Sequence, residues 1–85
     1  MWKVYVLRSL KDGTRYVGMT QDVNRRLLEH NSGKSKFTSG HQPWIIIYCE
    51  EFPNARDARL REKYLKSAVG RRFLDRMTGA GSLPD

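Results

Sequence analysis

RYVGMTQDVNRRLLEHN, residues 15–31, is the stretch that decides the fold class. Residues 14–19 are rich in β-branched and aromatic side chains, which predicts a strand. A short polar segment follows, in which Thr20 or Asp22 can cap a helix, and residues 22–31 then show helical periodicity. A strand that leads directly into a basic helix has two interpretations. The helix is either a solvated face or one wall of a site that binds phosphate.

The rest of the chain supplies the partners of this strand and helix. We predict a strand over 2–8, a turn at 11–13, a loop over 32–43, a strand over 44–49, a helix over 54–69 that begins at Asn54, a break at Gly70 and a short helix over 71–77. The nearly continuous apolar run WIIIYC at 44–49 indicates a buried, central strand. The order β-β-α-β-α-α predicts an α+β domain with a small, mainly antiparallel three-stranded sheet and flanking helices. We expect one domain over 1–77 and a flexible tail over 78–85.

Composition limits the classes of protein to which the chain can belong. Its 85 residues are 39% hydrophobic and carry a net charge of +7, which predicts attraction to nucleic acid. No apolar run approaches the roughly 20 residues of a membrane helix, so we expect no membrane partner. A single cysteine, Cys49, excludes an internal disulfide and a multi-cysteine zinc site. With no visible signal peptide, the chain is expected to be a reduced, cytoplasmic protein.

Helical geometry separates the polar residues of 22–31 into two groups. At about 100° per residue, Arg26 and His30 fall on the side of the apolar residues, one turn apart. Arg25 and Glu29 fall on the opposite side. We therefore expect Arg26 to point toward the sheet and Arg25 to face solvent.

The helix over 54–69 also places a charge beside its apolar stripe. Glu62 lies four residues after Ala58 and three before Leu65. An inward carboxylate is costly unless it is paired or binds a cation. One interpretation is a buried Arg26–Glu62 ion pair, with His30 as a hydrogen-bonded core residue. The other, which we favour, is a cleft lined by these three side chains, because a buried pair adds little net stability.

Two tyrosines and a glycine in the first two strands extend this candidate cleft. Tyr5 and Tyr16 lie on neighbouring strands of the predicted hairpin, and Gly18 shares a strand face with Tyr16. A glycine in a strand leaves room for a ligand or another backbone to approach. Either tyrosine alone is typical of a half-buried sheet residue. Together with the arginine, histidine and glutamate, they indicate a phosphate site.

These residues, taken in order, resemble the GIY-YIG nuclease superfamily, also called URI-type endonucleases. Lys3-Val4-Tyr5 and Tyr16-Val17-Gly18 match its two half-motifs, and the later matches are Arg26, His30 and Glu62. The resemblance covers roughly residues 2–74. It is strongest to short bacterial single-domain members, and the chain is also similar to the nuclease domain of the eukaryotic structure-specific endonuclease that cuts branched DNA. Lys3 replaces the glycine of the first half-motif, and no asparagine follows Glu62.

The resemblance implies a role for each matching side chain. Glu62 would bind one divalent cation, Mg²⁺ or Mn²⁺. Arg26 would hold the scissile phosphate and stabilise its developing charge. Tyr5 is the expected general base, Tyr16 would bond the phosphate or the nucleophile, and His30 would orient Tyr5 or accept its proton.

The loop that follows the basic helix is the expected substrate-contacting segment. Lys34 and Lys36 can meet a nucleic-acid backbone, and Phe37 can stack on an unpaired base. His41 and Gly18 complete the expected substrate-binding set. A solvated, mobile loop is an equally good interpretation of this segment.

The function expected from the sequence is a Mg²⁺-dependent endonuclease that hydrolyses phosphodiester bonds in DNA. Branched or flap DNA and a role in repair or recombination are the specific expectations, with a protein partner as one source of specificity. The alternatives are a non-catalytic basic nucleic-acid-binding module of the same fold and a small interaction domain with a structural Arg26–Glu62 pair.

Overall fold

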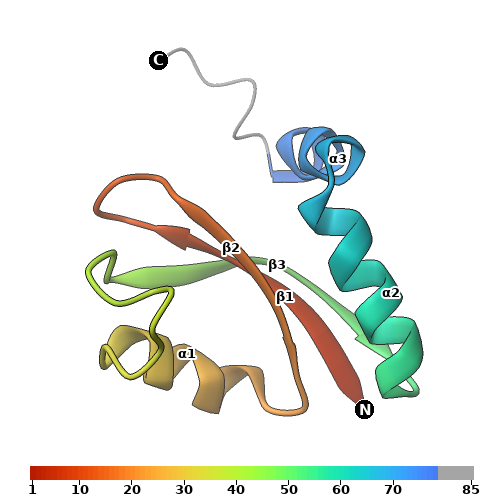
Figure 1. Ribbon diagram of the computed structural model, residues 1–85, viewed down its shortest axis with the longest axis horizontal. Coiled ribbons are helices and arrows are strands. Elements are labelled where there is room, and N and C mark those ends of the chain that lie inside the picture. Colours follow the sequence, from red (N-terminus) through yellow and green to blue (C-terminus); the bar gives the residue numbers. More distant parts are fainter. Residues whose placement is uncertain (79–85) are drawn as a thin grey trace.

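The computed structural model describes residues 1–78, which form one three-stranded sheet and three helices (Figure 1). The elements in chain order are β1 (Trp2–Ser9), β2 (Arg15–Thr20), α1 (Val23–Asn31), β3 (Trp44–Phe52), α2 (Ala55–Lys66) and α3 (Ala68–Thr78). This confirms the α+β class and the predicted order. Within the described residues, no helix is both long and apolar enough to cross a membrane. The expected flexible tail lies, from residue 79 onward, outside the described residues.

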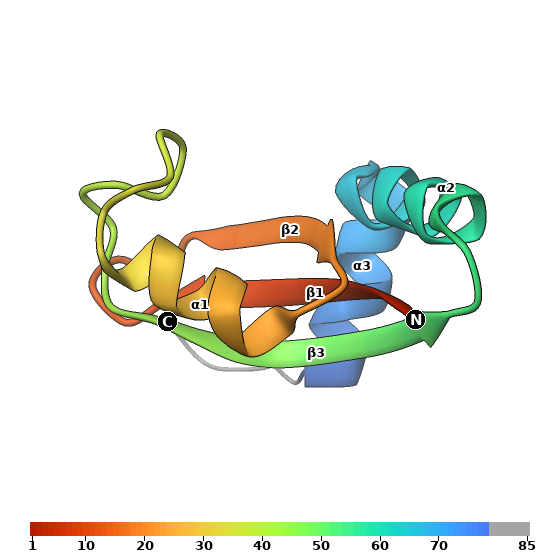
Figure 2. The ribbon, with the colours of Figure 1, turned by 90° about the horizontal axis from the view of Figure 1, so that it is seen from below.

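The central strand of the sheet is β1, and the prediction that residues 44–49 form a central strand is wrong. The strand order is β2-β1-β3 with antiparallel pairing throughout, as Figure 2 shows. β3 is therefore an edge strand, and its Ile45 and Cys49 are exposed. Its apolar run has another cause: Ile46 and Ile47 pack into different core clusters, because helices cover both faces of the sheet.

Alternate residues of β1 supply the two core clusters on opposite faces of the sheet. Val4 and Val6 pack with Leu65 of α2 and Leu74 of α3. On the other face, the cluster that contains α1 is formed by Tyr5, Leu7, Val23 and Trp44. The period-2 alternation of a strand thus turns Tyr5 toward α1 and its histidine. Figure 1 shows α1 on one side of the sheet and the α2–α3 pair on the other.

The chain turns between α2 and α3 at Ser67, three residues before the predicted break at Gly70. Ser67 has an extended backbone, with φ −77° and ψ 168°, which ends α2. Its hydroxyl oxygen then accepts from the backbone N–H of Gly70 at 3.1 Å and so caps α3. Gly70 is buried inside α3, and a Cβ there would lie 2.0 Å from the carbonyl oxygen of Tyr64. The glycine is required for close packing of two helices and does not break one.

Replacement of Gly70 by alanine is expected to lower the free energy of unfolding by about 1–3 kcal/mol, because the methyl group overlaps the α2 backbone. Alanine has the better helix propensity by about 1 kcal/mol, so the packing cost must exceed that gain. Urea denaturation followed by circular dichroism measures the change. Val69→Ala is the matched control, since Val69 is half exposed in the same turn. Equal stability of G70A and V69A would contradict the close helix contact.

Candidate active site

Gly18 lies directly opposite Tyr5 in the β1–β2 ladder. A Cβ at position 18 would lie 2.7 Å from the Tyr5 hydroxyl oxygen and 2.9 Å from Cε2 of Tyr16. The space that glycine leaves, which we expected to admit a ligand or another backbone, is therefore filled by the two tyrosine rings. Gly18 is needed to bring both rings together at this point of the sheet.

A buried chain of hydrogen bonds joins β1, α1 and the loop before β3. The Tyr5 hydroxyl lies 3.0 Å from Nε2 of His30, and Nδ1 of His30 lies 2.7 Å from Oγ1 of Thr38. None of the three residues is more than 1% exposed. The Trp44 indole N–H donates to the Thr38 carbonyl at 3.1 Å, which fixes the loop at this residue. His30 contacts Tyr5, the residue that we expected it to orient, whereas no sequence signal pointed to Thr38.

The pKa shifts of Tyr5 and His30 keep both groups in their neutral forms. Burial, assisted by Tyr16, raises the pKa of Tyr5, so the phenol keeps its proton. Burial, assisted by the positive charge of Arg26, lowers the pKa of His30, so the imidazole is neutral. A neutral imidazole donates from one ring nitrogen and accepts at the other, so His30 makes one bond of each kind with the hydroxyls of Tyr5 and Thr38.

The buried neutral His30 is expected to make the protein less stable as the pH falls below about 6.5, the ordinary histidine value. Below that pH, His30 binds a proton in the unfolded state but not in the folded state. The free energy of unfolding therefore falls by up to about 1.4 kcal/mol per pH unit. Urea unfolding between about pH 7.5 and 5 measures this slope, because the carboxylates with lowered pKa values contribute only below 4.5.

Two histidine variants identify the group responsible. H30Q should lose the slope, whereas H41Q should keep it. A slope that H41Q removes and H30Q keeps would assign the pH dependence to His41, the histidine paired with Asp12.

Arg26 lies beside both tyrosines but is bonded to its own helix. Its Nη1 lies 2.7 Å from Oε1 of Glu29, and this hydrogen bond, with contributions from Tyr5 and Tyr16, raises the pKa of Arg26. Arg25 is exposed as predicted. Glu29 does not face away as predicted: its side chain is only 31% exposed, because the long arginine side chain reaches across the turn to it.

Glu62 of α2 is paired with Lys66, at 3.3 Å between Oε2 and Nζ. The buried Arg26–Glu62 ion pair, one of the two interpretations of the sequence, is thus replaced by the Arg26–Glu29 pair within α1 and the Glu62–Lys66 pair within α2. Glu62 is nevertheless close enough to Tyr5 for its charge to raise the pKa of that phenol. Side chains from β2, α1 and α2 therefore all affect the pKa of the Tyr5 phenol of β1.

The donor set at Glu62 fits a magnesium ion. Within residues 1–78, no group of three or more histidine, cysteine or acidic side chains could hold a metal. A lone carboxylate suffices for Mg²⁺, which keeps several waters and takes further oxygens from a substrate phosphate. The Glu62 side chain is 17% exposed, and the single contact of 3.3 Å to a flexible lysine leaves its carboxylate available.

The residues of the loop over 32–43 that were predicted to contact substrate fall into two groups. Lys34, Lys36 and Phe37 are exposed, and Phe37 lines a pocket beside Tyr16. His41 instead lies 2.6 Å from Asp12 of the β1–β2 turn, and its carbonyl accepts from the Ser9 hydroxyl. The loop is thus fastened at two points, Thr38 and His41, with the exposed residues between α1 and Thr38 left for contacts with other molecules.

Comparison with known proteins relates this arrangement to one family. Residues 1–74 match the family model of the GIY-YIG catalytic domain. The chain is 41% identical over 64 residues to a UPF0213 protein of Clostridium perfringens, covering 74% of this chain and 68% of that one. It is 42% identical over 67 residues to a UPF0213 protein of Halobacterium salinarum, covering 78% and 86%. The solution NMR structure of a UPF0213 protein from Bacillus halodurans superposes with a TM-score of 0.55 at 35% identity, covering 96% of this chain and 90% of that chain.

Proposed function

Because the chain belongs to the GIY-YIG catalytic domain family, we propose that it is a metal-dependent endonuclease that hydrolyses phosphodiester bonds in DNA. One observation supports the proposal: Tyr16, Arg26 and Glu62, on three different elements, all lie close enough to Tyr5 to shift the pKa of its phenol. A purely structural network would not need a partly exposed carboxylate and a partly exposed guanidinium beside two phenols. Perturbed groups at an accessible site are typical of catalysis.

Arg26 is the proposed phosphate ligand. Its side chain is 34% exposed, so the guanidinium can meet an anion, while the bond to Glu29 holds it in place. A fixed planar guanidinium stabilises the charge that develops on phosphate oxygens without reorganising during the reaction.

Burial changes the choice of general base from Tyr5 to Tyr16. A general base must come within hydrogen-bond reach of the attacking water. Tyr5 is 1% exposed, is held by His30 and has a raised pKa, all of which oppose this role. Tyr16 is half-buried and lines an open pocket, so its hydroxyl can meet water. We assign Tyr5 and His30 to positioning Tyr16 and Arg26.

Glu62 is the proposed metal ligand. A bound Mg²⁺ would neutralise the scissile phosphate and stabilise the leaving oxygen. The ion would compete with Lys66 for the carboxylate, and a displaced Lys66 would be free to contact an adjacent phosphate. We extend the proposal to flap and branched DNA and to repair or recombination in the cytoplasm, on the resemblance to nucleases that cut branched DNA.

The test is cleavage of labelled flap, branched, single-stranded and duplex DNA with Mg²⁺ or Mn²⁺ and with EDTA. We expect cutting that EDTA abolishes. Arg26→Lys should lower the single-turnover rate about 10²–10³-fold, because an ammonium cannot reproduce the forked geometry. Arg25→Lys is the matched control, since Arg25 is the adjacent arginine and its side chain is 77% exposed.

The same assay decides against the proposal if no metal or substrate gives cutting. Salt-dependent DNA binding that persists in EDTA and in R26K, without cleavage, would make the domain a binding module. Failure to bind any nucleic acid would leave an interaction domain.

A further inference from the structure

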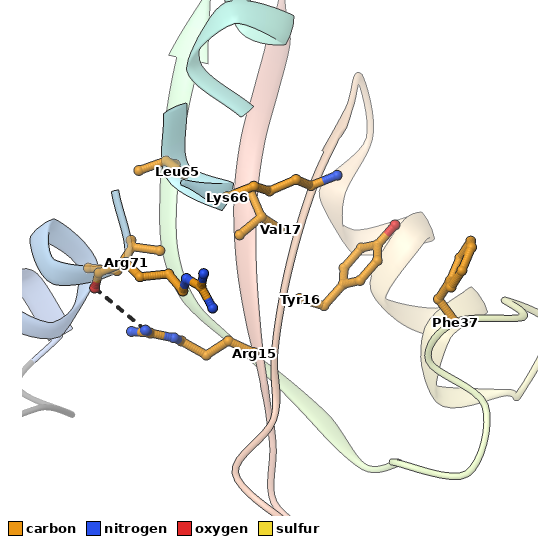
Figure 3. A pocket seen from close by; sticks show the side chains of 8 residues that line it. Arg15, Tyr16, Val17, Phe37, Leu65, Lys66 and Arg71 are labelled. Carbon is orange, nitrogen blue, oxygen red and sulfur yellow. Dashed lines mark hydrogen bonds between the residues drawn. The ribbon is translucent and has the colours of Figure 1, made fainter. Parts of the chain in front are cut away.

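A pocket of about 430 Å³ lies beside the edge strand β2 (Figure 3). It is lined by Arg15, Tyr16, Val17, Phe37, Leu65, Lys66, Arg71 and Leu74. The volume is in the range of pockets that bind small molecules. The lining combines three basic side chains, two aromatic rings and an apolar floor, and it contains no carboxylate.

The pocket adjoins the proposed catalytic site through two shared residues. Tyr16 contributes to both, and Lys66 connects them through its ion pair with Glu62. A group bound in the pocket would thus lie next to a phosphate held at Arg26 and Glu62. On a nucleic-acid chain, that neighbour is an adjacent nucleotide.

The two kinds of lining side chain occupy opposite sides of the pocket. In Figure 3 the rings of Tyr16 and Phe37 lie on one side, and Arg15 and Arg71 lie on the other. Arg15 is engaged with Asp75 and the Arg71 carbonyl, which holds it in position. Among the described residues, the Arg71 guanidinium makes no ion pair, so it can take a phosphate oxygen. A base needs an aromatic face and a phosphate needs a cation, and this arrangement offers both.

Phe37 has the aromatic face that such a ligand requires. Its ring is 80% exposed, more than any other large apolar side chain among residues 1–78. It directly precedes Thr38, whose bonds to His30 and Trp44 fix the backbone at this point. A ring on an anchored backbone, facing a pocket, is suited to stacking.

We propose that this pocket binds one unpaired nucleotide next to the scissile phosphate, with its base against Phe37 and Tyr16 and its phosphate at Arg71 and Lys66. The inference rests on the proposed nuclease function and adds a substrate feature to it. A base inside a duplex is stacked and paired, so it reaches the pocket only after unpairing, which costs energy. DNA with a single-stranded segment beside the cleavage position is therefore the preferred substrate.

Binding in EDTA tests the pocket separately from cleavage. The probes are a short fluorescein-labelled oligothymidine strand and a strand of equal length made of abasic residues, both followed by anisotropy. Phe37→Ala should weaken binding of the thymidine strand about tenfold and leave the abasic strand unchanged. Arg71→Ala should weaken both strands by a similar factor, whereas Arg72→Ala, an exposed neighbour outside the pocket, should weaken them less.

Fluorescence of a 2-aminopurine strand gives a second measurement of the same contact. Wild type should quench the base on binding, and F37A should not. Equal affinity of wild type and F37A for both strands, with no quenching, would overturn the pocket proposal.

Cleavage by the same variants separates the two proposals. Suppose that wild type cuts DNA with Mg²⁺, but that cutting depends neither on Phe37 nor on a base at the flanking positions. The pocket proposal would then be wrong and the nuclease proposal would stand. If binding depends on Phe37 and on the base but no DNA is cut, the pocket proposal would stand and the nuclease proposal would be wrong.

Discussion

Replacing Tyr16 by phenylalanine is expected to lower the single-turnover rate of DNA cleavage by about 10²–10⁴-fold, the usual contribution of a general base. The ring that packs beside Tyr5 and His30 is kept, so the fold should be unchanged. The variant loses only the hydroxyl that meets water. DNA affinity in EDTA, measured beside the rate, should change little.

The dependence of the rate on pH strengthens this test. A base that must lose its own proton before it acts makes the reaction accelerate with pH, by up to about tenfold per unit. Wild type should show this rise through neutral pH, and Y16F should lose it. Because Y16F keeps the Tyr5 hydroxyl, a pH rise that persists in Y16F and disappears in Tyr5→Phe would return the role of base to Tyr5.

Tyr5→Phe is the informative companion variant. It removes the hydroxyl that bonds to His30 and leaves a buried imidazole nitrogen unsatisfied, which costs about 1–3 kcal/mol of stability. We expect a smaller loss of rate than in Y16F, together with a lower urea midpoint. Loss of the Tyr16 hydroxyl should thus mainly lower the cleavage rate, whereas loss of the Tyr5 hydroxyl should mainly lower the stability.

Replacing Glu62 by glutamine should lower the rate about a thousandfold or more, because a catalytic metal contributes several kcal/mol to transition-state stabilisation. Glutamine keeps the shape and removes the charge that attracts the cation. Higher Mg²⁺ should restore part of the activity if the loss is in metal affinity. A Glu51→Gln variant is the matched control, since Glu51 of β3 pairs with Lys3 of β1 and its side chain is 57% exposed.

An activity of E62Q equal to that of E51Q would remove Glu62 from the site. Unfolding curves of both variants guard against a structural explanation. The Glu62–Lys66 pair is long, at 3.3 Å, and its lysine is half exposed, so the pair contributes little to stability and E62Q should fold like wild type.

Features with a local cause were predicted correctly from the sequence. Asp22 and Asn54 cap α1 and α2 as predicted, accepting from the backbone N–H three residues on. The β1–β2 hairpin follows from two strand-like runs around a turn. The inward direction of His30 follows from helical periodicity. The same periodicity predicts an inward Arg26, and this is only partly correct, because Arg26 is half-buried and its guanidinium turns to Glu29.

Features that depend on distant residues were missed. An apolar run indicates burial but does not show which strand is central, so the predicted central position of β3 was wrong. Gly70 has the same local signal whether it breaks a helix or admits a neighbouring backbone. Thr38 lies in a polar loop, and only the tertiary fold shows that it is buried against His30.

The position of β1 also has a consequence for folding kinetics. β1 pairs with β2 across a short turn, but its pairing with β3 joins Ser9 to Trp44, 35 residues apart. Closing the larger loop has the greater entropic cost, and non-local pairing slows folding. Thr38 and Glu62 lie in or beyond that loop, so they can join Tyr5 only after it closes. We therefore expect enzymatic activity to return with the slowest phase of refolding, after the hairpin has formed.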